Sequence, residues 1–126
     1  MMLAPDGSLQ LRFGCMGANM QPQGQVQIVV NILDRGMNLQ QAIDAPRVRP
    51  LDGRRISVEP HPGSDLAGAL AALGHEIVTG EEVPADWMAP HDFMRSFEGS
   101  AQAIAIGDST LSGASDPRLD RIAVAW

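Results

Sequence analysis

The chain is poor in cysteine and lacks lysine altogether. Cys15 is the single cysteine among 126 residues, so no disulfide can form within the chain. We interpret it as a small buried thiol, with a nucleophile as the alternative. All nine basic residues are arginines. The phosphate loop of nucleotide-binding proteins is therefore excluded, because that loop requires a lysine.

Positive charge and long apolar runs are also scarce. A net charge of −6 and a pI near 4.8 argue against nucleic-acid binding, which usually needs a basic patch. No run approaches the roughly 18 apolar residues of a membrane span. The first residues have neither the basic flank nor the apolar segment of a signal peptide. We therefore expect no nucleic acid and no membrane among the partners.

What is present is the composition of a globular domain. The 44% hydrophobic content and the length of 126 residues suffice for one hydrophobic core. A strong turn signal at Pro5-Asp6-Gly7 predicts a hairpin that begins close to the start of the chain. Such a hairpin indicates a boundary set inside a fold, so residues 1–126 are expected to form a single partial domain.

Alternating patterns and turn residues predict a mixed α and β chain with several adjacent antiparallel strands. The expected strands are Leu9–Phe13, Ile56–Glu59, Ile77–Val78, Ala101–Ile106, Thr110–Ala114 and Ile122–Trp126. One expected helix runs from the N-cap Asn19 to Gly36, a second follows a capping box at Asn38, and a third spans Asp65–Leu73. For the first helix, the predicted core face is Val26, Val29, Val30 and Leu33, with Ile28 and Ile32 on another side.

The stretch Gly80–Gly99 is the least regular part of the chain, acidic and rich in the few aromatic residues. Long loops inside compact domains often serve function or assembly, so a solvated loop and a partner contact both stay open. His91-Asp92, with Glu81 and Glu82, has the donor types of a metal site, but a solvated acidic loop is the favoured interpretation. We expect neither a metal nor a cofactor.

A glycine-punctuated stretch, Phe13–Gly24, joins a predicted strand to the first helix. A helix N-terminus has unpaired N–H donors and the positive end of the helix dipole, so such a turn can bind an anion. Gly14, Gly17 and Gly24 do not have the spacing of a dinucleotide-binding loop. From the pattern alone, a structural turn is favoured over an anion site.

No complete catalytic set stands out elsewhere in the sequence. The three histidines are well separated, and no serine lies in a G-x-S-x-G elbow. Asp116 and Arg118 flank Pro117 closely enough to interact, and we expect a structural ion pair there.

Several stretches together resemble the C-terminal part of the small subunit of a gamma-glutamyltransferase (gamma-glutamyltranspeptidase). Gly14–Ala18 is similar to the family's Gly-Ser-Pro-Gly-Gly segment. Met16–Gly24 is closer still to the branch with Met-Gly-Gly followed by Gln-Pro-Gln-Gly. The other similar stretches are Asn31–Asn38, Ala42–Arg47, Ala101–Ile104 and Gly113–Arg118. They occur in the family's order over nearly the whole chain.

The resemblance implies an α+β fold, the C-terminal portion of an N-terminal-nucleophile hydrolase with mostly antiparallel sheets in an αββα sandwich. Members of the family cleave themselves, and the freed threonine of the small subunit attacks glutathione or another gamma-glutamyl amide. The acceptor is water, an amino acid or a peptide, and an acylase acting on a related amide is a variant. Residue by residue, the backbone N–H groups of Gly17 and Ala18 correspond to the oxyanion-hole donors. The cytoplasm is the favoured compartment, with the periplasm or the extracellular space as the alternative.

The sequence also departs from the family. Ala18 stands where the family usually has a second glycine, and alanine resists a positive φ, so a turn that needs one would be misaligned. Thr79 and Thr110 are internal, and neither matches the N-terminal nucleophile. We expect the nucleophile and the large subunit to lie outside residues 1–126, on an upstream segment or a partner chain. The alternative is a non-catalytic remnant of the fold that self-associates or binds a partner through a sheet edge.

Overall fold

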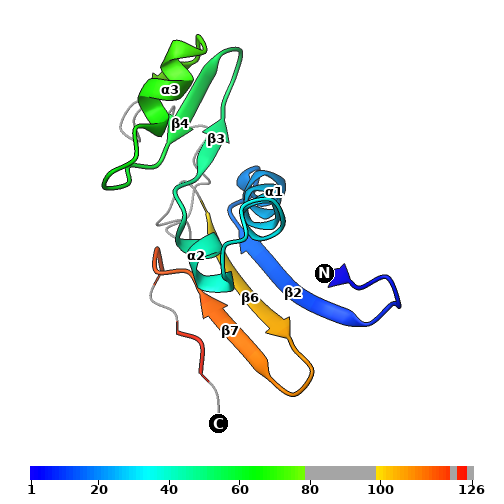
Figure 1. The fold of residues 1–126 in the computed structure, drawn as a ribbon. Helices are drawn as coiled ribbons and strands as arrows, with labels where there is room; N and C mark the ends of the chain where they lie inside the picture. Colours follow the sequence, from blue (N-terminus) through cyan, green and yellow to red (C-terminus); the bar gives the residue numbers. More distant parts are fainter. Residues whose placement is uncertain (79–98, 120–121, 125–126) are drawn as a thin grey trace.

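The computed structural model describes residues 1–78, 99–119 and 122–124 (Figure 1). The described strands form two sheets, one in the order β1-β2-β6-β7 and one in the order β3-β4-β5. Within the described residues, every strand pairing is antiparallel except the parallel pairing of β4 with β5. This arrangement confirms the α+β class and the mostly antiparallel strands expected from the sequence.

The four-stranded sheet places the glycine turn. Its strands are β1 (Met2–Leu3), β2 (Leu9–Met16), β6 (Ser100–Ile106) and β7 (Leu111–Ser115). The pairing of β2 with β6 runs from Leu11 opposite Ala105 to Met16 opposite Ser100. The end of β2 therefore lies beside the start of β6, although the two are far apart in sequence. The turn that follows Met16 is brought next to Gly99 by this register.

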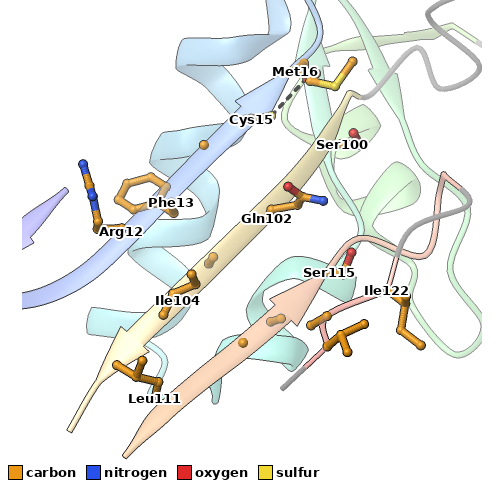
Figure 2. Close-up of a pocket in the computed structure, with 16 residues that line it drawn as sticks. Arg12, Phe13, Cys15, Met16, Ser100, Gln102, Ile104, Leu111, Ser115 and Ile122 are labelled. Atoms are coloured by element: carbon orange, nitrogen blue, oxygen red, sulfur yellow. Dashed lines mark hydrogen bonds between the residues drawn. The ribbon is translucent and has the colours of Figure 1, made fainter. Parts of the chain in front are cut away.

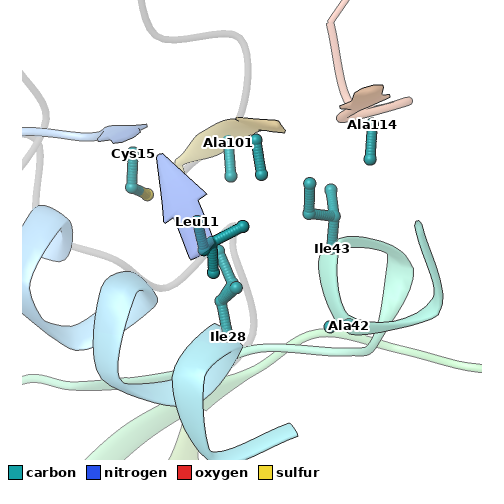
Figure 3. Packing of buried hydrophobic residues seen from close by; sticks show 8 residues of the cluster. Leu11, Cys15, Ile28, Ala42, Ile43, Ala101 and Ala114 are labelled. Carbon is teal, nitrogen blue, oxygen red and sulfur yellow. The ribbon is translucent and has the colours of Figure 1, made fainter. Parts of the chain in front are cut away.

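One face of this sheet is covered by α1 (Met20–Leu33) and α2 (Leu39–Asp44) (Figure 1). Successive side chains of a strand point to opposite faces, so every second residue of β2 and β6 meets the helices. The buried cluster consists of Leu11, Cys15, Ile28, Ala42, Ile43, Ala101, Ala103 and Ala114 (Figure 3). The sheet contributes mainly alanines to this cluster, and such small side chains let the helices pack closely on the strands.

The face of α1 that is buried differs from the prediction. Met20, Gly24, Ile28 and Asn31 are buried, whereas Val26 and Leu33 are 62% and 60% exposed. Gly24 explains the difference, because a β-carbon there would lie only 2.8 Å from the Cys15 sulfur. The helix thus presses its glycine side against β2. A count of apolar residues misses such a face, since glycine contributes no apolar side chain.

The start of α2 confirms the predicted capping box. The Asn38 side chain accepts a hydrogen bond from the Gln41 N–H at 2.9 Å, and the Asn38 N–H donates to the Gln41 side chain at 3.1 Å. Gln40 ties the helix to the sheet: its amide nitrogen donates to the Ser115 carbonyl at 2.9 Å and its oxygen accepts from the Ser115 N–H at 3.3 Å. The end of β7 is therefore held against α2.

The three-stranded sheet consists of β3 (Val48–Pro50), β4 (Arg55–Val58) and β5 (Glu76–Val78), with α3 (Leu66–Ala72) beside it. The sequence predicted β4, β5 and α3 but missed β3, because three residues that end in a proline show no alternating pattern. Gln27 of α1 joins β3 to the rest of the fold. Its side chain donates to the Val48 carbonyl at 2.7 Å and accepts from the Val48 N–H at 2.8 Å.

The opposite face of the four-stranded sheet is covered only in part by the described residues, because residues 122–124 lie against β7 beside Gly113. It carries a hollow of about 1150 Å³ whose walls include Met16, Ser100, Gln102, Ile104, Leu111 and Ser115 (Figure 2). Ile104 and Leu111 are 47% and 72% exposed on this face. The same strands therefore carry a packed face and an open, largely apolar face.

Two predictions concern the end of the chain and the long loop. Residues 122–124 adopt no regular secondary structure, so the predicted strand Ile122–Trp126 is wrong for them. Of the irregular stretch Gly80–Gly99, every residue except Gly99 lies outside the described part of the chain. Among the helices that the structure describes, none is long and apolar enough to cross a membrane.

Candidate functional site: the glycine turn and its supports

The turn between β2 and α1 has an unusual backbone. Gly17 has a φ of 136° and Ala18 a φ of 47°, and Ala18 is the one non-glycine residue with a positive φ among those described. Left-handed conformations cost a non-glycine residue about 1–2 kcal/mol. The concern that alanine would resist this conformation is answered, because Ala18 adopts it.

The hydrogen bonds of the turn start the helix but use none of the N–H groups of Gly17, Ala18 and Asn19 among the described residues. The Met20 N–H donates to the Gly17 carbonyl at 2.8 Å, and the Gln21 N–H donates to the Ala18 carbonyl at 3.0 Å. Asn19 is the N-cap, as predicted, but its side chain makes no capping hydrogen bond. Within the described ranges, the N–H groups of Gly17 and Ala18 donate to no backbone acceptor. Ala18 is exposed, and Gly17 is buried behind it.

Cys15 lies directly beneath this turn. It is buried, and its thiol donates to the Met16 carbonyl at 3.2 Å (Figure 2). Burial raises the pKa of the Cys15 thiol, and the positive charge of Arg47 offsets only part of that effect. A thiol held protonated is a poor nucleophile. The interpretation of Cys15 as a small buried thiol is thus confirmed.

A buried ion network lies beside the turn, and sequence reasoning found only part of it. The Arg47 guanidinium contacts the Asp116 carboxylate at 2.7 Å, with 2% and 0% of the two side chains exposed. Arg118 contacts the other carboxylate oxygen of Asp116 at 3.0 Å and also pairs with Glu59. The expected pair of Asp116 with Arg118 is confirmed. Arg47 and Glu59 were missed, because they lie far from Asp116 along the chain.

The electrostatics of this network favour its charged form. Burial alone would raise the pKa of Asp116, but the Arg118 N–H and the charges of Arg47 and Arg118 outweigh it and lower the pKa. Burial likewise opposes the charge of Arg118, whereas its hydrogen bond to Glu59 and the charge of Asp116 raise the pKa of the guanidinium. The network therefore holds two positive and two negative side chains, and its charges balance.

Potential metal ligands do not gather into a site in the part of the chain that the structure describes. No cluster of three or more histidine, cysteine or acidic side chains occurs there. His61 and His75 are both exposed on the surface. The candidate metal donors Glu81, Glu82, His91 and Asp92 all lie outside the described residues.

Comparison with known proteins matches the whole chain to one family. The sequence model described as gamma-glutamyltranspeptidase matches residues 1–126. The Acylase ACY 1 proenzyme of Pseudomonas sp. (strain V22) is 33% identical over 126 residues, which are 99% of this chain and 20% of that protein. The chain thus spans about a fifth of the length of the first curated relatives it matches.

Two solved structures have the same fold as the chain. Gamma-glutamyltranspeptidase from Pseudomonas nitroreducens, complexed with L-DON, superposes with a TM-score of 0.77 at 23% identity, over 100% of this chain and 60% of that one. Cephalosporin acylase from Bacillus halodurans superposes with a TM-score of 0.73 at 37% identity, over 90% of this chain and 19% of that one. The N-terminal-nucleophile hydrolase fold implied by the sequence resemblance is confirmed by these superpositions.

Proposed function

Because the chain belongs to the gamma-glutamyltranspeptidase family, we propose that it is the C-terminal part of an amide-cleaving enzyme, a gamma-glutamyl hydrolase or transferase. In this proposal the N–H groups of Gly17 and Ala18 form the oxyanion hole. The single observation that carries the proposal is the turn itself. Two adjacent N–H groups stand at the N-terminus of α1, in a left-handed backbone, without a backbone acceptor among the described residues.

The chemistry needs such a pair of donors. A threonine hydroxyl adds to the carbonyl carbon of the amide, and the carbonyl electrons move onto oxygen to give a tetrahedral oxyanion. Collapse of this intermediate expels the amine, which takes up the proton that the threonine hydroxyl gave up, and leaves an ester on the threonine. Water or an acceptor amine then cleaves that ester and returns a proton to the threonine oxygen. Each donor that is already aimed at the developing charge lowers the activation free energy by about 3 kcal/mol. The positive end of the α1 dipole acts in the same direction.

The threonine that attacks the substrate lies outside residues 1–126 in this proposal. The matched relatives are about five times longer than the stretch they share with this chain, which leaves ample room for a nucleophile-bearing segment. The open part of this sheet face also supports a covering segment, because the Ile104 and Leu111 side chains are 47% and 72% exposed there. Burying such apolar surface under a further segment would stabilise the assembled protein.

The decisive experiment removes one donor without changing a side chain. An ester bond in place of the Gly17–Ala18 amide deletes the Ala18 N–H. In the enzyme assembled from this chain and its nucleophile-bearing segment, we expect kcat on a chromogenic gamma-glutamyl anilide to fall about 100- to 1000-fold, as for other oxyanion donors. An ester at Gly107–Asp108, in the exposed hairpin turn, is the matched control and should leave kcat unchanged. Equal rates for the two esters would refute the oxyanion role of this turn.

A matched substrate pair identifies the acyl group. A gamma-glutamyl anilide carries an α-amino group, whereas the corresponding glutaryl anilide lacks only that group. We propose the gamma-glutamyl amide, with glutathione as the representative donor, on the strength of the family match. A higher kcat/KM for the glutaryl anilide would place the chain with acylases, the class of two similar proteins.

A second candidate function is a non-catalytic module that self-associates or binds a partner. It is favoured by the open part of the sheet face, where Ile104 and Leu111 are exposed beside an apolar hollow. Monomeric proteins rarely expose large apolar patches. Light scattering on the purified chain tests this candidate, and a monomer at micromolar concentration would argue against it. Turnover by the assembled enzyme would instead favour the amide-cleaving function.

A further inference from the structure

The backbone of Gly99 packs against the backbone of the glycine turn at Met16 and Gly17. A β-carbon on Gly17 would lie 3.0 Å from the Gly99 α-carbon, and a β-carbon on Gly99 would collide with the Met16 carbonyl oxygen. Gly99 itself has a φ of 74°, a conformation that other residues rarely adopt. The two backbones are therefore in direct contact. Since packed interiors transmit strain, a shift of Gly99 would move the peptide that leads into Gly17.

The side chain that holds Gly99 comes from a different part of the fold. Arg47 lies 52 residues away along the chain, and its Nη1 donates to the Gly99 carbonyl at 3.0 Å. The other arm of the guanidinium, Nη2, donates to the Ile43 carbonyl at 3.2 Å and to Asp116 Oδ2 at 2.7 Å. One planar group thus links the end of α2, the residue after β7 and the start of β6.

Asp116 fixes the position of this guanidinium. Its Oδ2 also accepts the Ala101 N–H at 2.8 Å, two residues beyond Gly99. Its Oδ1 accepts both the N–H and the Nη1 of Arg118 at 3.0 Å. The segment from Gly99 to Ala101 is thereby held at one end by Arg47 and at the other by Asp116.

We propose that Arg47 is a positioning residue for the oxyanion turn, acting through the Gly99 carbonyl. This inference rests on the proposed function of Gly17 and Ala18. The fork of the guanidinium is essential, because one nitrogen anchors to Asp116 while the other holds Gly99. A lysine ammonium keeps the charge but lacks this planar fork, so it cannot hold both groups in the same geometry.

The test uses the assembled enzyme, with the nucleophile-bearing segment produced so that it already begins with its threonine. Self-cleavage is then not required for activity. We expect Arg47→Lys to lower kcat by about 10- to 100-fold, the effect of a small misplacement of reacting groups. KM should change by no more than about twofold, because the donors act mainly in the transition state. Affinity for a tetrahedral boronate, which mimics that state, should fall by the same factor as kcat.

Arg54→Lys is the matched control. Arg54 is an exposed arginine that also donates to a glycine carbonyl, that of Gly74, at 2.5 Å, but it lies in the turn that leads into β4. The Arg54→Lys substitution should leave kcat, KM and boronate affinity unchanged. An unchanged kcat in Arg47→Lys would overturn the proposal. A fall in kcat without the matching loss of boronate affinity would overturn it as well.

A second variant separates positioning from loss of fold. Arg47→Ala should regain kcat when guanidinium ion is added, whereas methylammonium at the same concentration should give no rescue. Failure of both variants to assemble with the nucleophile-bearing segment would show a structural role only and would also overturn the proposal. If instead the native assembly is inactive, or the ester at Ala18 has no effect, the proposed function fails. If activity depends on the Ala18 N–H but is unchanged by substitution of Arg47, the positioning role of Arg47 is refuted and the proposed function stands.

Discussion

Asp116 and Arg47 meet at 2.7 Å in the interior of the protein, where 0% and 2% of their side chains are exposed. Removing charges from water is costly, and such a pair is tolerable only when the remaining hydrogen-bonding capacity is used. Asp116 meets this condition, because its carboxylate also accepts hydrogen bonds from Ala101 and Arg118. The stability of the fold should therefore be sensitive to the loss of either charge.

Asp116→Asn should destabilise the assembled protein by about 3–5 kcal/mol, because the buried Arg47 charge then loses its counter-charge. Chemical unfolding measures this loss. The control is Asp52→Asn, since Asp52 contacts Arg55 at 3.2 Å on the surface with 59% and 31% of the side chains exposed. Exposed pairs contribute no more than about 1 kcal/mol. Equal losses for the two variants would contradict the importance of the buried network.

The same carboxylate should make stability depend on pH. The Arg118 N–H and the two arginine charges hold the pKa of Asp116 below its ordinary value of 3.8 despite burial. A depressed pKa stabilises the folded state at pH values above the unfolded pKa, and that contribution is lost as the pH falls through the folded pKa. Unfolding free energies measured between about pH 5 and about pH 2 should fall less steeply in Asp116→Asn than in the native protein. An identical slope would assign the acid sensitivity to other carboxylates.

Ala18→Gly should stabilise the protein by about 1 kcal/mol, because glycine adopts the φ of 47° without the penalty that alanine bears. Thermal unfolding measures the change. Ala71→Gly makes the same substitution on an exposed position of α3 and should destabilise by about 1 kcal/mol. Destabilisation by both substitutions would mean that the strain at Ala18 is absent.

Gly24→Ala should destabilise the protein by about 1–3 kcal/mol although alanine is the better helix former, because the added carbon would lie 2.8 Å from the Cys15 sulfur. The double variant with Cys15→Ala provides the control, since shortening Cys15 opens the space that the new methyl group needs. Chemical unfolding of the two single variants and the double variant gives the coupling. Additive effects would show that α1 does not press on β2 through Gly24.

The predictability of the candidate site differed from residue to residue. The turn itself was recognisable, because glycines between an alternating strand and an apolar helix form a local pattern. The assignment of its N–H groups came from family resemblance and stays a prediction. Arg47 lies in the family-like stretch Ala42–Arg47, but the resemblance gave it no role in the site. Glu59 carried no sequence signal, because a glutamate at a strand end is an ordinary surface pattern.

By itself the sequence determined the local features of this protein. The capping box of α2, the alternation along β2 and the turns of the two hairpins depend on neighbours a few residues apart, and such short-range geometry is encoded in residue type. The tertiary structure alone decided three things: which face of α1 is buried, that Ala18 takes a positive φ, and that Arg47 reaches Asp116. These depend on contacts between distant segments, 69 residues apart in the last case. Only packing brings such groups together, and it then outweighs local preference.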